Sequence, residues 1–247
     1  MILCTEDIRT YICFLISRTK DMSTSNGMTS ITRKFFMALS GFFLVSFLIL
    51  HSSLNMLSVI APDMFNTASH FMGTNPLIQF AMQPVLAFGV VFHLAMGLYL
   101  EWQNQQARNV KYAVNKPGEN SSWMSRNMII TGIMILLFLG LHFYDFWIPE
   151  LKLKFIAGDM TGLNEAGNFR YLEELQHKFQ NPIRTGLYVI SFVFLSLHLL
   201  HGFQSAFQSV GFRHNKYTPL IKTLGNIYAI VIPAMFVFIA IYHFINA

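Results

Sequence analysis

Five long apolar stretches divide the chain, and shorter polar segments separate them. Each stretch approaches or exceeds the roughly 20 residues with which a helix crosses a hydrocarbon core of about 30 Å. None contains Lys or Arg, and their one acidic residue, Asp145, lies near the end of the third. The pattern predicts an all-α polytopic membrane protein with five transmembrane helices. These helices are predicted over approximately residues 35–60, 77–100, 127–148, 185–207 and 223–245.

The composition indicates the same surroundings. Of the 247 residues, 53% are hydrophobic and only 12% are charged, and 25 are phenylalanine. A soluble globule of this size would need more polar surface. We therefore expect lipid to surround most of the chain.

The basic residues are unevenly distributed, and this predicts the orientation. Twelve of the 17 Lys and Arg lie in the N-terminal segment and in the connections 101–126 and 208–222. Short basic segments stay on the cytoplasmic side of a membrane, so the N-terminus is predicted to lie inside. The formal charge of +5 is then mostly a signal of topology, and we expect no nucleic-acid partner.

Residues 1–30 are predicted to be a flexible cytoplasmic extension, and residues 31–247 the membrane domain. We expect no cleaved signal peptide, because Glu6 and Asp7 precede a short apolar run where a signal peptide carries positive charge. Cys4 and Cys13 lie in the extension, where a reducing compartment disfavours a disulfide.

Four of the nine histidines lie one apiece in the first four stretches. An interval of sixteen or seventeen residues carries a helix roughly 24 Å, about four-fifths of the way through the core. Because consecutive helices run in opposite directions, these histidines should form two tiers, His51 with His142 near the outer face and His93 with His201 near the inner face. The intervals run from Lys34 to His51, Leu77 to His93, Arg126 to His142 and Arg184 to His201.

Paired histidines inside a bilayer favour haem ligation. A single intramembrane histidine can also bond a neighbouring helix or line a water cavity. Two imidazoles facing each other across a four-helix bundle, however, are what a six-coordinate haem iron requires. The first four helices are therefore predicted to form a haem-binding up-down bundle.

His198 competes with His201, since the two lie on one helix about 60° apart around its axis. The interval favours His201 as the ligand, which leaves His198 as a possible neighbour of the haem or a polar residue facing another helix. The remaining histidines fall in loops or at a helix end, where ordinary solvated side chains are expected. They are His70, His177, His214 and His243.

Two segments resemble a known family. Residues 31–41 (ITRKFFMALSG), together with Leu50 and His51, and residues 197–211 (LHLLHGFQSAFQSVG) resemble the cytochrome b membrane anchor of succinate dehydrogenase or fumarate reductase. The resemblance is to the single-chain, five-helix, two-haem type, often called the b558 family. It covers about residues 28 to 245, with the four histidines in register.

The resemblance implies a dihaem cytochrome b domain in a bacterial inner membrane. A flavoprotein would interconvert succinate and fumarate, an iron–sulfur protein would relay electrons, and this chain would carry them through two b-type haems to or from a quinone, typically menaquinone. The outer haem would be held from the first and third helices, and the inner haem from the second and fourth.

Further residues are candidates for contacts with quinone, haem propionates and partners. Connections 101–126 and 208–222 would dock the iron–sulfur subunit or bind anionic lipid, and a short surface helix is predicted from Tyr171 to Phe179 within the outward segment 148–184. Solvated or interfacial side chains are the alternative for each polar residue. The quinone candidates are Asp63, His70, Gln83 and Asp145, and the propionate candidates are Arg33, Lys34 and Arg126.

Two other functions fit parts of the pattern. The anchor of another quinone-linked enzyme, such as formate dehydrogenase or nitrate reductase, would also hold two haems. A haem-free transporter would use the same histidines as proton-coupled groups. Cytochromes of the bc type place two ligands on each of two helices, and that spacing is absent from this sequence.

Overall fold

The computed structural model describes residues 29–106 and 127–246, and helices dominate that part of the chain. Five of them are long and apolar enough to cross a membrane, which confirms the all-α prediction and the number of spans. The chain is a multi-pass membrane protein. Most of the predicted extension 1–30 and of the connection 101–126 lies outside the described residues. The five spans are Ser30–Ile60, Ile78–Gln106, Met128–Ile156, Pro182–Ser209 and Thr218–Ile245.

Local signals in the sequence set several helix ends. Thr29 caps the first span, α2 (Ser30–Ile60), by accepting a hydrogen bond from the backbone N–H of Thr32. Pro62 lies in the first turn of the short helix α3 (Pro62–Thr74), where its missing N–H costs nothing. Asn181 caps the fourth span, α10 (Pro182–Ser209), in the same way as Thr29.

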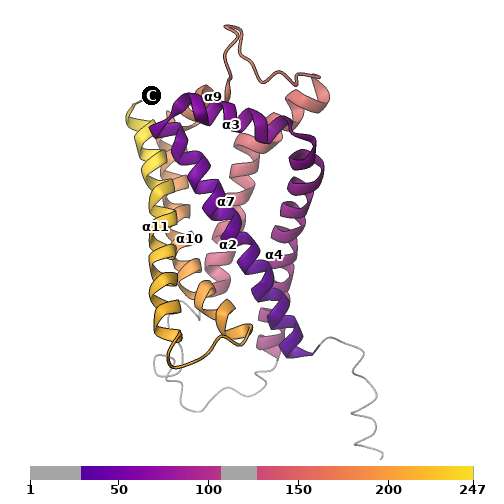
Figure 1. Cartoon of the computed structure of the whole chain (residues 1–247), viewed down its shortest axis with the longest axis vertical. Helices are drawn as coiled ribbons and strands as arrows, with labels where there is room; N and C mark the ends of the chain where they lie inside the picture. The colour runs from indigo at the N-terminus through magenta and orange to yellow at the C-terminus, as the bar shows by residue number, and fades with distance from the viewer. Residues whose placement is uncertain (1–28, 107–126, 247) are drawn as a thin grey trace, which may run out of the picture.

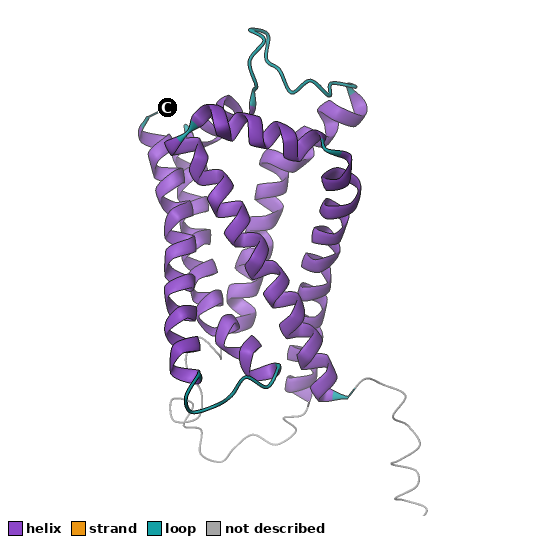
Figure 2. Ribbon diagram, viewed as in Figure 1, coloured by secondary structure: helices purple, strands orange, loops and turns teal. Residues whose placement is uncertain are grey.

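The second and third spans, drawn as helix in Figure 2, contain π-helical turns. In the second span, η1 (Ile78–Met82) precedes α4 (Gln83–Gln106), so Pro84 lies in the first turn of α4. The third span is built from four consecutive segments. They are α7 (Met128–His142), η2 (Phe143–Trp147), α8 (Ile148–Leu151) and η3 (Lys152–Ile156).

The third span is longer than predicted, because its helix continues past residue 148 to Ile156. Lys152 and Lys154 belong to the outward segment 148–184 of the sequence prediction, but Lys154 is buried and pairs with Glu150 one turn earlier, at 2.7 Å. The Lys154 ammonium also donates to the carbonyl of Gly73 at the end of α3. Neutralised in this way, the lysine can remain within the helix.

Consecutive spans run in opposite directions, and α3 and α9 (Tyr171–Phe179) lie across one end of the molecule (Figure 1). We call this the α3–α9 end; the fifth span, α11 (Thr218–Ile245), also finishes there. The α9 helix confirms the short helix predicted at this position.

Contacts between the spans define their neighbours. The α2 helix packs against α4, α10 and α11, and α10 also packs against α7 and α11. A buried aromatic cluster, which includes Phe192 of α10 and Phe236 of α11, joins these helices. Large apolar side chains such as Phe88 and Leu137 cover the outside, as lipid surroundings require.

Candidate functional site

Four histidines of the membrane-spanning helices form two close pairs of rings. The rings of His51 on α2 and His142 on α7 have centroids 5.8 Å apart. Phe47 stacks on His51, and Phe138 stacks on His142. The first tier predicted from the sequence is therefore present as a close pair of rings.

The second pair joins His93 of α4 to His198 of α10, with ring centroids 6.4 Å apart. The ring that faces His93 is thus His198 and not His201, which the interval had favoured. Counted from Ile78 and Pro182, the first residues of their spans, His198 also lies nearer the depth of His93. The interval was measured from Arg184, although the helix begins two residues earlier.

Hydroxyl groups fix the tautomer of both histidines in the second pair. Ser40 Oγ lies 3.0 Å from His93 Nδ1 and donates its proton to the carbonyl of Met37. Because a hydroxyl has only one proton, both contacts are hydrogen bonds at once only when His93 Nδ1 carries hydrogen and donates it to Ser40 Oγ. Nε2 is then the unprotonated nitrogen that can bind a metal.

Thr131 on α7 makes the same kind of contact with His198. Its Oγ1 lies 3.2 Å from His198 Nδ1 and donates to the carbonyl of Met128. Metal-bound histidines characteristically donate their second ring N–H to a neighbouring acceptor, which fixes the ring orientation. Both members of this pair therefore present Nε2 in the form that a metal needs. Sequence reasoning missed both hydroxyls.

The first pair has different partners. Asn55, one turn after His51, places its amide nitrogen 3.4 Å from His51 Nδ1. His142 Nδ1 is buried, and no hydrogen-bond partner among the described residues satisfies it. The two tiers thus differ in the groups available to the second ring nitrogen.

The spacing of both pairs fits a metal held between two imidazoles. Rings bound to opposite faces of one iron, through metal–nitrogen bonds of about 2 Å, have centroids roughly 6 Å apart. Glycines lie beside the rings of the second pair: a Cβ on Gly41 would meet His93 at 3.6 Å, and one on Gly132 would meet His198 at 3.9 Å. Within the described residues no cluster of three or more His, Cys, Asp or Glu side chains could hold a bare metal ion. The donor set therefore fits haem better than a bare ion.

The remaining histidines differ in their surroundings. His177 and His214 are exposed, as expected, whereas His70 is half-buried and stacks on Phe169. The expectation of a solvated His243 is wrong. Only 1% of its surface is exposed, and its Nε2 lies 2.9 Å from Ser58 Oγ. The interface between α2 and α11 encloses it, although it stands near the end of the chain.

The four quinone candidates differ in their exposure and in their contacts. Asp63 is exposed at the start of α3, and Gln83 is half-buried at the start of α4. His70 Nδ1 lies 3.4 Å from the hydroxyl of Tyr171 at the α3–α9 end. Asp145 is buried, which rules out the alternative of a solvated interfacial side chain.

Asp145 lies among polar groups of α10. Tyr188 donates its hydroxyl to Asp145 Oδ2 at 3.0 Å, and Arg184 Nε lies 3.4 Å from the same oxygen. The Tyr188 ring also lies against His142, with centroids 6.4 Å apart. A phenol thus adjoins the first histidine pair, and it is bound to a carboxylate that also pairs with a guanidinium.

The propionate candidates lie at the other end of the molecule. Arg33 donates to the hydroxyl of Tyr99 at 2.9 Å and covers the ring of that residue. Lys34 is exposed on the same turn of α2. Arg126 lies outside the described residues. The α2–α4 contact therefore holds one of these cations in a defined position.

Charged side chains at the α3–α9 end form one network. Arg170 pairs with Glu150, with Glu174 at 2.8 Å and with Asp159 at 3.7 Å. Burial opposes the charge of Arg170, but Glu150 and Glu174 outweigh it and raise the pKa of the guanidinium above its usual value. Burial, followed by the charge of Glu150, raises the pKa of Tyr171 to about 12. The network joins the third span to α9.

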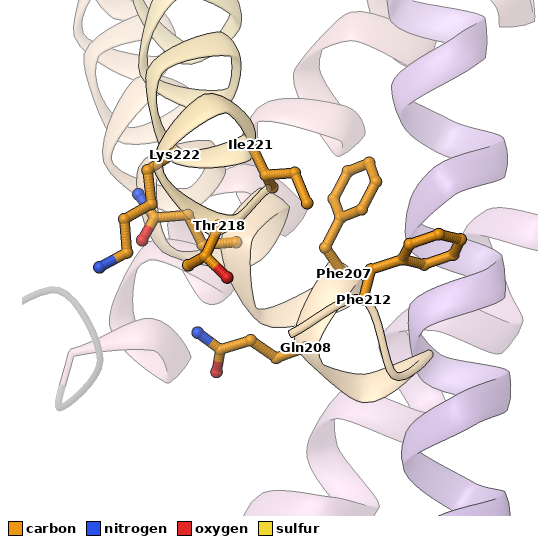
Figure 3. Close-up of a pocket in the computed structure, with 7 residues that line it drawn as sticks. Phe207, Gln208, Phe212, Thr218, Ile221 and Lys222 are labelled. Carbon is orange, nitrogen blue, oxygen red and sulfur yellow. The ribbon is translucent and has the colours of Figure 1, made fainter. Parts of the chain in front are cut away.

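A small cleft lies between the end of α10 and the start of α11 (Figure 3). Its volume is about 10 Å³, which is room for about one water molecule. Phe207, Phe212, Thr218 and Lys222 are among its lining residues. It is too small for a haem or a quinone, so the histidine pairs remain the candidate site.

The site must be interpreted from its own geometry. No protein-family model, curated protein or solved structure matches this chain.

Proposed function

We propose that the chain is the membrane anchor of a succinate:quinone oxidoreductase and holds two b-type haems. The observation that carries the proposal is the presence of two histidine pairs, each drawn from two helices, at 5.8 and 6.4 Å. The first four spans would form the haem-binding bundle, with His51 and His142 holding the outer haem and His93 and His198 the inner one.

The histidines of the second pair and the hydroxyls beside them have distinct proposed roles. His93 and His198 would bind iron through Nε2, while Ser40 and Thr131 hold their Nδ1–H groups and so fix the ring planes. A haem held between two imidazoles exchanges single electrons and has no open iron position for oxygen or substrate. His201, one turn further along α10, would lie beside this site.

The α3–α9 end is the proposed place for quinone chemistry. Reduction of a quinone consumes two protons, so its pocket needs groups that donate hydrogen bonds and protons. His70 with Tyr171 supplies such groups at this end. The quinone is expected to be menaquinone, as in the family that the sequence resembles.

The partners and orientation follow from the same proposal. An iron–sulfur subunit, joined to a flavoprotein, would dock at the end opposite α3 and α9, which carries the basic connections 101–126 and 208–222. That end would face the cytoplasm of a bacterium, together with the N-terminus, because translocation of short basic segments is disfavoured.

The test is purification of the tagged chain from its native membrane, followed by spectroscopy and identification of bound subunits. We expect about two haems per chain with low-spin b-type spectra, reduced on addition of succinate, and a flavoprotein with an iron–sulfur protein in the preparation. Reduction by formate with different subunits would assign the chain to another quinone-linked enzyme. Absence of haem would leave a transporter as the better explanation.

A further inference from the structure

Two buried polar atoms near the outer histidine pair lack partners. One is His142 Nδ1 and the other is Asp145 Oδ1, and within the described residues neither has a hydrogen bond. By contrast, hydroxyl oxygens satisfy the corresponding nitrogens of His93 and His198. A buried polar atom without a partner is costly, so this pair of atoms requires an explanation.

The other carboxylate oxygen of Asp145 is already fixed. Oδ2 accepts from Tyr188 at 3.0 Å and lies 3.4 Å from Arg184 Nε, which balances its negative charge. Tyr188 also packs against the ring of His142. One oxygen of the carboxylate is therefore anchored to Tyr188, whose ring lies against His142, and the second oxygen remains free to accept.

The position of Asp145 on its helix favours the same partner. Side chains on a helix lean towards its N-terminus, so a residue one turn after His142 leans back towards it. Asp145 lies within the π-helical turn η2, from Phe143 to Trp147, which begins directly after His142 and changes which side chains share a face. Such turns occur frequently at functional sites.

We propose that Asp145 is a positioning residue that accepts the Nδ1–H of His142 when His142 binds the outer haem through Nε2. This inference rests on the proposed function. The carboxylate sets the tautomer of His142 and increases electron donation by its imidazole, which lowers the reduction potential of that haem. The inner haem, whose histidines donate to neutral hydroxyls, receives no such contribution.

The experiment is a redox titration of the purified complex, followed by optical and electron paramagnetic resonance spectra of both haems. The haem content of the unsubstituted complex is measured first, because its absence would refute the proposed function itself. In Asp145→Asn we expect both haems to be retained and one midpoint potential to rise. The haem that shifts should be the one lost in His142→Ala. Glu165→Gln, an equal charge change on an exposed residue, should shift neither.

A second variant separates this role from a merely structural one. Tyr188→Phe removes a donor from Oδ2 and leaves more negative charge on Oδ1, so it should lower the same potential. Opposite shifts in the two variants support the proposal. Unchanged potentials in Asp145→Asn would overturn it, and if quinone turnover alone declined, Asp145 would instead be a proton donor to quinone.

Discussion

The chemistry of single residues explains why His93 and His198 suit a metal. Each histidine lies beside a hydroxyl whose own proton is given to a carbonyl of the preceding turn, at Met37 for Ser40 and at Met128 for Thr131. The hydroxyl oxygen can then only accept, and the nearby ring nitrogen must donate. Ser40 on α2 and Thr131 on α7 thereby determine the tautomer of both rings, although neither helix carries a histidine of this pair.

Thr131 provides a test of this arrangement. Thr131→Val keeps the shape of the side chain but removes the hydroxyl, so retention of the inner haem should weaken by about 10–100-fold. Thr131→Ser preserves the bond and should behave like the unsubstituted protein. The measurement is haem content during dilution in detergent. Equal retention in Val and Ser variants would show that His198 is not the ligand that Thr131 orients.

Among the elements, the extension of the third span determines the structure of the α3–α9 end. The helix continues to Ile156 and brings Glu150 between Lys154 and Arg170. The third span is thereby tied both to the end of α3, through the carbonyl of Gly73, and to the segment preceding α9. The His51–His142 pair lies towards this end of the molecule. A rigid structure at this end therefore affects access to that pair.

Arg170→Ala should loosen this end. Removal of the guanidinium leaves Glu150 and Glu174 without their shared cation, at a cost of roughly 2–4 kcal/mol for a partly buried cluster. We expect a lower melting temperature in detergent and faster hydrogen exchange in residues 157–179. Lys152→Ala, which removes an exposed cation from the same end, is the matched control. Indistinguishable exchange in the two variants would contradict a structural role for the network.

At the scale of the whole molecule, the two histidine pairs lie at different heights between the α3–α9 end and the opposite end. An electron carrier that connects a soluble partner at one end with a quinone at the other needs this separation. In the proposed function charge would move across the membrane, so the orientation of the chain would decide where protons are taken up.

Labelling of introduced cysteines tests the orientation. In a background with Cys4→Ser and Cys13→Ser, Asp63→Cys should react with an impermeant maleimide on intact cells. Lys216→Cys should react only after permeabilisation, since it lies in a basic connection at the opposite end. Both positions are exposed. The reverse pattern would place the N-terminus outside.

Sequence reasoning reached the five spans and the His51–His142 pair because length, apolar composition and helical rise are properties of each segment alone. The choice between His198 and His201 depends on how α10 starts and rotates, which neighbouring helices determine. Burial of Asp145 and His243 likewise depends on partners from distant segments, Tyr188 and Ser58. Counting from polar boundaries could not reveal those contacts.

Haem stoichiometry in single histidine variants shows whether each histidine pair holds one haem. We predict two haems in the unsubstituted complex and one in each of four variants, with His51→Ala and His142→Ala losing the same haem and His93→Ala and His198→Ala losing the other. The His201→Ala variant should retain both. Two haems in all four variants would rule out these histidines as haem ligands. Loss of one haem from His51→Ala and a different one from His142→Ala would rule out the pairing of these two residues.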